Sequence, residues 1–463
     1  MQTLVNDIGA LVWGPLTIVL LVGTGLYLSF RLRLIQVVHL WLSLKIVSGR
    51  DREGGDAGDL SQFSALTLAL SAAIGNGNIA GVATAIALGG PGAILWMWVT
   101  ALVGMATVYA STTLSVAYRS HDAATGYSGG PMYYIERGLG PRWKPLAQFF
   151  AFCAILAAFG TGNMVEANSV ADTLEFSLRD VIGYADTTAL VAGVKLLIGI
   201  VYAALIWLVI VGGIRRIGQV VSTLVPLMFV LYVGSALVVL GLYADAIPAA
   251  LAQIVNDAFT GTAATGGFAG AGVMATIQFG VARGVFSNEA GLGTTPIAMA
   301  SARTSEPVRA GLVAMNGPLF DTLIVCTITA LVILVTGVWQ TGVSGSELTT
   351  MAFNAAVPDL GKVAVTLSLL FFSFSSVVGW SYYGDRGTHY LFGERAVGLY
   401  KRVFCLLLPL GAVMELELIW ALCDIANGLM AIPNLIALLL LSPVVVTLTR
   451  EYFARQQERD AAQ

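Results

Sequence analysis

Long apolar runs alternate with short polar connections along nearly the whole chain. A helix that crosses the hydrocarbon core of a bilayer needs about 20 mostly apolar residues. The predicted spans are residues 11–30, 60–88, 91–118, 145–173, 188–211, 217–243, 265–302, 309–336, 361–385, 398–420 and 424–449. The pattern therefore predicts an all-α integral membrane protein with about 11 transmembrane helices.

The second predicted span contains a stretch that a helix does not favour. Within residues 60–88 the chain reads Gly75-Asn76-Gly77-Asn78-Ile79-Ala80-Gly81. Glycine costs about 1 kcal/mol relative to alanine inside a helix, and asparagine competes with the backbone for hydrogen bonds. Inside a bilayer, unwound backbone persists only where it is buried in protein or lines a polar cavity. This stretch predicts a broken helix whose free backbone groups bind a ligand.

The seventh predicted span repeats this irregularity. Residues 284–293 read GVFSNEAGLG, and the heptapeptides 78–84 and 288–294 share Asn, Ala, Gly and Thr at matching positions. Each break lies in the first helix of a five-helix set, so the two sets enter the membrane in opposite directions. Interrupted helices at matching positions of inverted repeats indicate the midplane binding site of a secondary transporter.

The resulting organisation has four parts. Residues 1–59 form one extra spanning helix and a cytoplasmic amphipathic segment, 60–243 the first inverted repeat, 265–449 the second, and 450–463 a cytoplasmic tail. The amphipathic segment, residues 31–52, is expected to lie along the membrane surface. Residues 119–143 form a long connection with Gly-Gly-Pro turn chemistry, and its simplest interpretation is a plain connector.

The basic residues predict the orientation. With the N-terminus outside the cell, all but four of the 24 Lys and Arg fall in or beside cytoplasmic connections. The exceptions are Arg179, Lys195, Arg283 and Lys362. By the positive-inside rule the N-terminus is outside and the C-terminus cytoplasmic.

Composition excludes several classes of protein. The chain is 57% apolar and 11% charged, whereas soluble domains are about 25% charged. Nucleic acid is not an expected partner, because no basic face is large enough to neutralise phosphates. An enzyme is not expected either, since no Ser/His pair, metal-ligand set or cofactor motif shares one depth. The sequence makes no prediction of an oligomeric state.

A broken helix offers two kinds of binding group. The N-terminus of a half-helix presents N–H groups to an anion, while its C-terminus and unwound carbonyls present oxygen to a cation. A small amino acid together with Na⁺ fits both. The predicted Na⁺ ligands are Ala73, Asn76, Ser375 and Ser376. The alternative for the serines is a hydrogen bond to their own helix or to a neighbouring helix.

Charged side chains inside the membrane mark functional positions. Glu289 lies in the second break, where it pairs either with a substrate ammonium or with Arg283; Arg283 alternatively satisfies carbonyls at the end of the half-helix. Glu166 lies on the fourth predicted span, on the same helix face as Asn163. Asp321 is interpreted as a packed residue and left outside the site.

Five motifs carry a resemblance to a known family. They are GNGNIAGVATA (75–85), GGPGAILWMWVTALVG (89–104), GGPMYYIE (129–136), GVFSNEAGLG (284–293) and GWSYYGDR (379–386). Over nearly its whole length the chain resembles the alanine or glycine:cation symporter family. The resemblance implies the leucine-transporter architecture preceded by one extra helix, Na⁺-coupled uptake of alanine or glycine, and a prokaryotic inner membrane.

The predicted substrate-binding residues combine this resemblance with the intramembrane charges. They are Gly77, Asn78, Glu166, Phe286, Ser287, Glu289 and Trp380. Two positions depart from the family pattern, which usually has glutamine in place of Glu166 and often threonine in place of Asn76. A carboxyl group beside a zwitterion keeps open a proton-coupled transporter that uses Glu166. A substrate-gated channel or a sensor is the other alternative.

Overall fold

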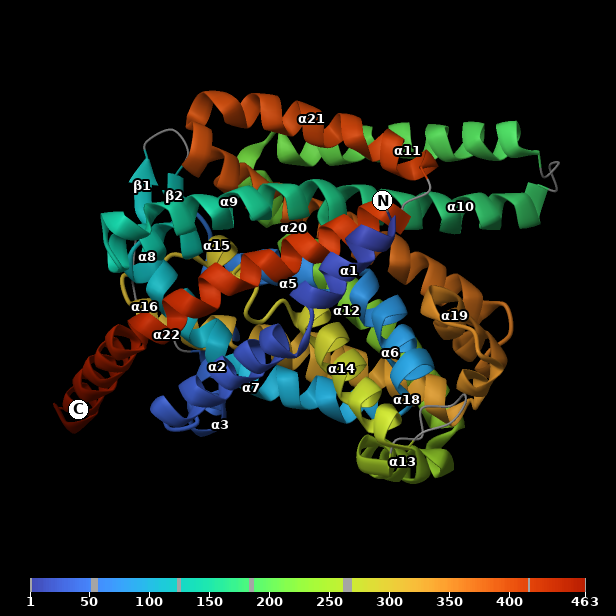
Figure 1. Cartoon of the computed structure of the whole chain (residues 1–463), viewed down its shortest axis with the longest axis horizontal. Helices are drawn as coiled ribbons and strands as arrows, with labels where there is room; N and C mark the ends of the chain where they lie inside the picture. The colour runs from blue at the N-terminus through green and yellow to red at the C-terminus, as the bar shows by residue number, and fades with distance from the viewer. Residues whose placement is uncertain are drawn as a thin grey trace.

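The computed structural model describes residues 2–50, 57–122, 126–182, 187–260, 269–414 and 417–462, and these residues are helical almost throughout (Figure 1). The predicted start of the second repeat, at residue 265, lies outside the described residues. Within the described ranges, eight helices are long and apolar enough to cross a membrane. A bent pair, Gln62–Ala73 and Gly77–Gly89, raises the number to nine if it is counted as one span. The prediction of an all-α, multi-pass membrane protein is confirmed.

The N-terminal part of the chain forms four helices. They are α1 (Gln2–Val12), α2 (Pro15–Arg31), α3 (Ile35–Val38) and α4 (Leu40–Val47). The apolar helix α2 occupies the place of the first predicted span and packs against α7 (Ala93–Ala117) and α22 (Glu417–Ala462). Arg33 and Leu34 have positive φ angles of 55° and 56°, so a left-handed turn separates α2 from α3. The predicted amphipathic segment is thus two short helices that follow a sharp turn.

The next part of the chain begins with the broken helix. Its elements are α5 (Gln62–Ala73), the π-helix η1 (Gly77–Gly81), α6 (Val82–Gly89), α7, β1 (Ser120–Asp122), β2 (Gly126–Ser128), α8 (Pro131–Gly138), η2 (Pro141–Trp143), α9 (Lys144–Phe159), the π-helix η3 (Gly160–Val165), α10 (Glu166–Ile182), α11 (Thr188–Ile210) and α12 (Gly213–Leu242).

The last part contains the second interruption. Its elements are η4 (Ala244–Ala246), α13 (Ile247–Thr260), α14 (Ala269–Asn288), α15 (Thr295–Met299), α16 (Pro307–Ala314), α17 (Asn316–Pro318), the π-helix η5 (Leu319–Cys326), α18 (Thr327–Val335), η6 (Val338–Thr341), α19 (Gly345–Ala356), α20 (Leu360–Phe392), α21 (Glu394–Val413) and α22.

The connection at residues 119–143 is more than a plain connector. Strands β1 and β2 pair antiparallel with Ser120 opposite Ser128. Helix α8 then buries Met132 and Tyr134 completely, and the Tyr134 hydroxyl donates to the side chain of Asn434 on α22. The segment does more than connect two helices, because five consecutive residues of α8, from Pro131 to Ile135, are buried against neighbouring helices.

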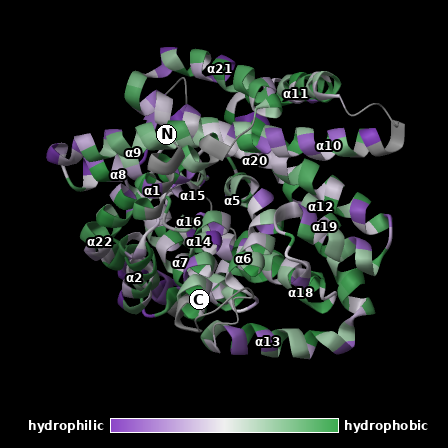
Figure 2. Cartoon of the chain, turned by 45° about the vertical axis from the view of Figure 1, so that its right-hand side comes forward, coloured by the Kyte–Doolittle hydropathy of each residue, from purple (hydrophilic) through white to green (hydrophobic). Residues whose placement is uncertain are grey.

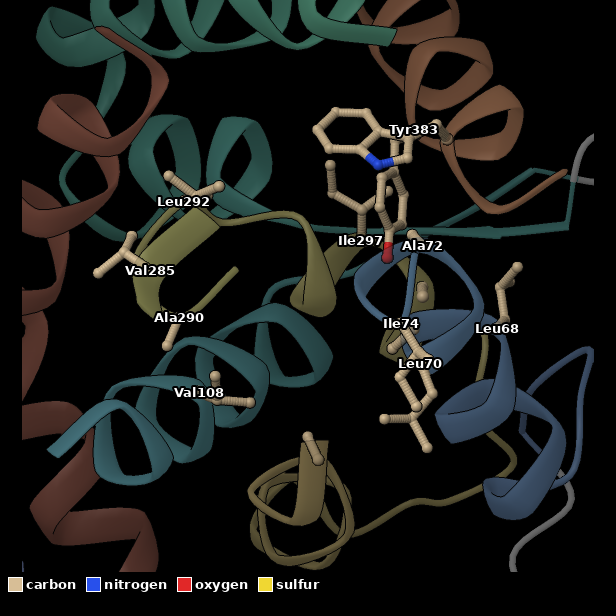
Figure 3. Packing of buried hydrophobic residues seen from close by; sticks show 14 of the residues in the cluster. Leu68, Leu70, Ala72, Ile74, Val108, Val285, Ala290, Leu292, Ile297 and Tyr383 are labelled. Atoms are coloured by element: carbon tan, nitrogen blue, oxygen red, sulfur yellow. The ribbon is translucent and has the colours of Figure 1, made fainter. Parts of the chain in front are cut away.

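Apolar packing holds both interrupted helices in place. Helix α7 lies against α14 and α16, while α20 lies against α5, α9 and α12. Figure 3 shows Ala72 and Ile74 at the end of α5, and Ala290 and Leu292 of the second break beside α7. All four side chains are buried. The two breaks therefore belong to the interior of the bundle, while many residues of the surrounding helices are hydrophobic too (Figure 2), and many large hydrophobic residues are exposed.

Candidate functional site

The first break lies where α5 ends at Ala73. The helix axis bends by 54° between α5 and the π-helical continuation. Asn78 Oδ1 accepts a hydrogen bond from the backbone N–H of Gly75 at 2.9 Å, so an asparagine side chain satisfies part of the unwound backbone. A methyl group added to Gly77 would lie 3.4 Å from both Phe286 Cδ1 and Ser287 Cα. The first break therefore touches the residues just before the second.

The second break follows Asn288, the last residue of α14. Glu289 has a φ of 54°, and Gly291 and Gly293 have φ values of 97° and 90°. Glycine tolerates this left-handed backbone, whereas a residue such as glutamate pays about 1–3 kcal/mol, and such strain is concentrated at functional sites. Thr294 Oγ1 donates to Glu289 Oε2 at 2.6 Å. The turn thus holds a buried carboxyl group at a fixed place beside the first break.

Asp321, on the π-helix η5, joins the two breaks. Its Oδ1 accepts from Asn78 Nδ2 at 2.6 Å, and its Oδ2 accepts from Ser287 Oγ at 2.8 Å. The neighbouring Thr322 hydroxyl also donates to Oδ2, at 2.6 Å. The sequence interpretation of Asp321 as a packed, hydrogen-bonded residue holds. It contacts one predicted site residue from each break, so it supports the site from behind.

The serines predicted to bind Na⁺ face the end of α5. Ser375 Oγ and Ser376 Oγ each lie 3.3 Å from a backbone carbonyl oxygen, those of Ser71 and Ala72. Ser375 also donates to Phe372 O at 2.9 Å, which is the self-bonding alternative. Hydroxyl and carbonyl oxygens are the ligands that hard cations prefer.

A cavity of about 20 Å³ lies between the two breaks, enough for about one water molecule. Eight of the predicted site residues line it: Ala73, Asn76, Gly77, Glu166, Phe286, Glu289, Ser376 and Trp380. Three predicted residues do not line it. Asn78 and Ser287 lie behind the wall on Asp321, and Ser375 turns toward Ser71.

Several buried oxygen atoms around the cavity lack a protein partner. Within the described residues, Asn76 Oδ1, Glu166 Oε2 and Asn427 Oδ1 have no hydrogen-bond donor. Buried polar groups without partners are rare in folded proteins and call for a ligand, a water or an ion. These three acceptors come from three different spans and line one cavity. The arrangement suits a ligand that brings hydrogen-bond donors or positive charge.

Arg283 stays apart from Glu289. Its guanidinium carbon lies 5.8 Å from the centre of the Phe286 ring, a cation–π distance. Glu289 takes its hydrogen bond from Thr294 instead. Of the two alternatives for Glu289, the pair with Arg283 is therefore not among the contacts of the described residues.

Two polar side chains of the cavity escaped sequence reasoning. Thr161, on η3, accepts a hydrogen bond from Asn427 Nδ2 of α22 at 3.1 Å, and both line the cavity. The signal for Thr161 was present in the Gly160-Thr161-Gly162-Asn163 stretch, which resembles the first break in glycine content. Asn427 is a single amide in a long apolar helix, and sequence alone gave it no distinguishing neighbour.

Two interrupted helices that face each other around a buried polar cavity define a class of membrane protein, the secondary transporters. A model of the sodium:alanine symporter family matches residues 1–463. The chain belongs to that family, so it is a transporter and not an enzyme.

Relatives of the chain match it over nearly their full length. The sodium/alanine symporter AgcS of Methanococcus maripaludis is 45% identical over 97% of each chain. A Bacillus subtilis protein named "Probable sodium/glutamine symporter GlnT" is 36% identical over 98% of this chain and 91% of its own. The amino-acid carrier protein AlsT of Bacillus subtilis is 34% identical over 99% and 93%. Family and relatives support cation-coupled amino-acid symport.

Proposed function

We propose that the protein is a Na⁺-coupled symporter of a small neutral amino acid, alanine or glycine, and works by alternating access in the cell inner membrane. One observation carries this proposal. The buried acceptors Asn76 Oδ1, Glu166 Oε2 and Asn427 Oδ1 line a cavity between two helix breaks and have no donor within the described chain. An ammonium group supplies the missing donors, and a nearby carbonyl cluster accepts the cation.

The amino acid and the Na⁺ ion bind at two different places in the site. The substrate ammonium contacts the unpartnered acceptors, and its carboxylate faces free N–H groups at the start of a half-helix. Na⁺ binds between the carbonyls at the end of α5 and the hydroxyls of Ser375 and Ser376. Phe286 and Trp380 pack against the side chain of the substrate. Because the cavity measures only about 20 Å³, the walls must separate for an amino acid to enter.

Asp321 is proposed as a positioning residue. It holds Asn78 and Ser287 from the two breaks through hydrogen bonds of 2.6 and 2.8 Å. A change on one side of this carboxyl group therefore alters the geometry of the other break. Such a connection gives Na⁺ and substrate a route to strengthen each other's binding, which is reciprocal by thermodynamic linkage.

The proposed topology has eleven spans in two inverted five-helix repeats behind one extra helix. The bent pair α5 and α6 opens the first repeat, and the interrupted pair α14 and α15 opens the second. The positive-inside distribution supports an external N-terminus and a cytoplasmic C-terminus.

Equilibrium binding tests the coupling. Labelled L-alanine is titrated into purified protein in Na⁺ or in K⁺ at equal ionic strength, with glycine, D-alanine, serine and glutamine as competitors. We expect Na⁺ to tighten alanine binding about 5- to 150-fold, the usual range of coupling between sites. Equal affinity in both salts, or glutamine competing better than alanine and glycine, would refute the proposed ligand set.

A proton-coupled transporter is the second candidate, and the buried, unpartnered Glu166 Oε2 favours it. Glutamine at this position keeps the shape of the side chain but carries no titratable proton. If Glu166→Gln transports with an unchanged pH profile and unchanged Na⁺ dependence, protons on Glu166 take no part. A lost pH dependence with Na⁺-independent uptake would instead favour the proton-coupled reading.

A further inference from the structure

A large hollow lies away from the small cavity between the breaks. It measures about 620 Å³ and lies between the turn that follows α2, the short helix α3 with His39 after it, and the C-terminal part of α22. Three arginines line it: Arg31, Arg33 and Arg450. Its floor is apolar, with Ile35 and Phe453 among the lining side chains. We call this hollow the arginine groove.

The arginine groove is positively charged. Within the described chain, no Asp or Glu is among its lining residues. His39 stacks on Phe453 with ring centroids 4.0 Å apart, and burial lowers its pKa below the ordinary 6.5. The positive charge at neutral pH therefore comes from the arginines, whose planar guanidinium groups donate paired hydrogen bonds to phosphate oxygens.

The groove side of α22 is a single helical face. Val446, Thr449, Arg450, Phe453, Ala454 and Gln457 line the groove at the i, i+3, i+4 spacing of one helix side. Glu451 and Glu458 each follow a lining residue by one position, which turns them about 100° around the helix. The acids of α22 thus point away from the arginines.

The groove lies where the apolar runs of α2 and α22 give way to basic residues, which is where these helices are expected to leave the hydrocarbon. The apolar helix α2 ends at Arg31, and Arg450 follows the long apolar run of α22. Val38, which lines the groove, and Trp41, three residues further along the chain, are each 65% exposed. Lys45 Nζ lies 6.0 Å from the centre of the Trp41 ring. Exposed apolar and tryptophan side chains beside basic residues are typical of a helix at the membrane interface.

We propose that the arginine groove binds the headgroup of an anionic phospholipid from the leaflet on the basic side of the protein. The guanidinium groups of Arg31, Arg33 and Arg450 hold the phosphate, and an acyl chain runs along the apolar floor. Basic pockets between helices at this depth are known to select anionic headgroups. The left-handed turn at Arg33 brings two of the three arginines to the same opening.

Native mass spectrometry of the full chain tests the proposal. The protein is delipidated in neutral detergent and titrated with phosphatidylglycerol or with phosphatidylcholine. The variant R31Q/R33Q/R450Q removes the three groove charges. Its matched control, R142Q/R395Q/R402Q, removes three exposed arginines elsewhere on the same side. Each basic residue near an anionic lipid contributes about fivefold, so we expect the groove variant to bind phosphatidylglycerol about one hundredfold more weakly.

The outcomes separate the proposal from its alternatives. Wild type and control are expected to retain one phosphatidylglycerol that the groove variant loses, with no difference for phosphatidylcholine. Equal retention by the groove variant, or equal binding of phosphatidylcholine, overturns the proposal. Displacement of the lipid by millimolar inorganic phosphate also overturns it, because the acyl chain would then contribute nothing. If the triple variant unfolds, the single change R33Q is titrated in its place and must lose about fivefold.

Discussion

Gly75→Ala places a methyl group inside the proposed substrate cavity. The added carbon would lie 3.4 Å from both Glu166 Oε1 and Ser376 Oγ, an ordinary van der Waals distance. The variant should therefore fold, and replacing glycine also lowers the entropy of the unfolded chain, worth about 0.4–1 kcal/mol. The effect should fall on the ligand, because a methyl group fills most of a cavity of about 20 Å³.

The expected loss of substrate affinity follows from the free-energy cost of overpacking the cavity. Forcing an extra methyl group into a filled interior costs about 1–3 kcal/mol. Since this cost arises only when substrate occupies the cavity, it appears as a 5- to 150-fold weaker affinity at about 1.4 kcal/mol per tenfold. Uptake of labelled alanine into proteoliposomes should show a raised KM, while the melting temperature of the ligand-free protein stays near that of wild type.

Gly81→Ala is the matched control for this variant. Gly81 lies on the same interrupted helix, but a methyl group there meets no atom within 4 Å. We expect wild-type KM and a slightly raised melting temperature, since alanine is the better helix former by about 1 kcal/mol. If Gly75→Ala and Gly81→Ala both transport with wild-type KM, the cavity between the breaks is not where substrate binds.

Three further predictions concern the surroundings of the site. A methyl group on Gly162 would lie 2.1 Å from Trp380 Cβ, so Gly162→Ala should lower both melting temperature and uptake; wild-type values for both would contradict the packing. Asp321→Asn leaves one side-chain acceptor oxygen for three donors. The free energy of unfolding should fall by about 1–3 kcal/mol, and the affinity for Na⁺ should also fall. Unchanged denaturation and Na⁺ titration curves would count against a positioning role. A hydrogen bond from Tyr390 and an ion pair with Lys144 lower the pKa of Glu136 below its usual 4.5. The ionised Glu136 side chain therefore contributes its full stabilisation above about pH 4.5, and this stabilisation is lost as the pH falls through the lowered pKa. Glu136→Gln should flatten this acid-side loss in thermal melts between pH 3 and 6, and an unaltered slope would show that the contact contributes nothing.

The two breaks were predictable because their residues conflict with a helix in lipid. Glycine and asparagine in an apolar run leave backbone groups that need partners, and this located the two breaks. Gly77 and Glu289 were singled out within them by the family motifs and, for Glu289, by its charge inside the membrane. The same reasoning missed Asp321. A single acid in an apolar helix looks like a packed residue, and two of its three side-chain hydrogen bonds come from residues more than thirty positions away in the chain.

The rest of the site was harder to predict, because the sequence does not say which side of each helix faces the cavity. Ser375 and Ser376 are neighbours in sequence, but only Ser376 lines the cavity, because successive helical side chains point about 100° apart. Asn427 reaches the cavity from α22, and its partner Thr161 lies 266 positions earlier. Their meeting depends on how α9, η3 and α22 pack, which no local pattern in the sequence encodes.

Accumulation against a gradient tests the central claim most directly. Proteoliposomes containing the full chain are loaded with K⁺ and diluted into Na⁺ or into K⁺, each with labelled L-alanine and with the membrane potential clamped. Alanine is expected to accumulate above its external concentration only when Na⁺ is outside, and dissipating the Na⁺ gradient should abolish the accumulation. Accumulation that is equal in Na⁺ and K⁺, or a flux that only equilibrates alanine in both, would contradict it.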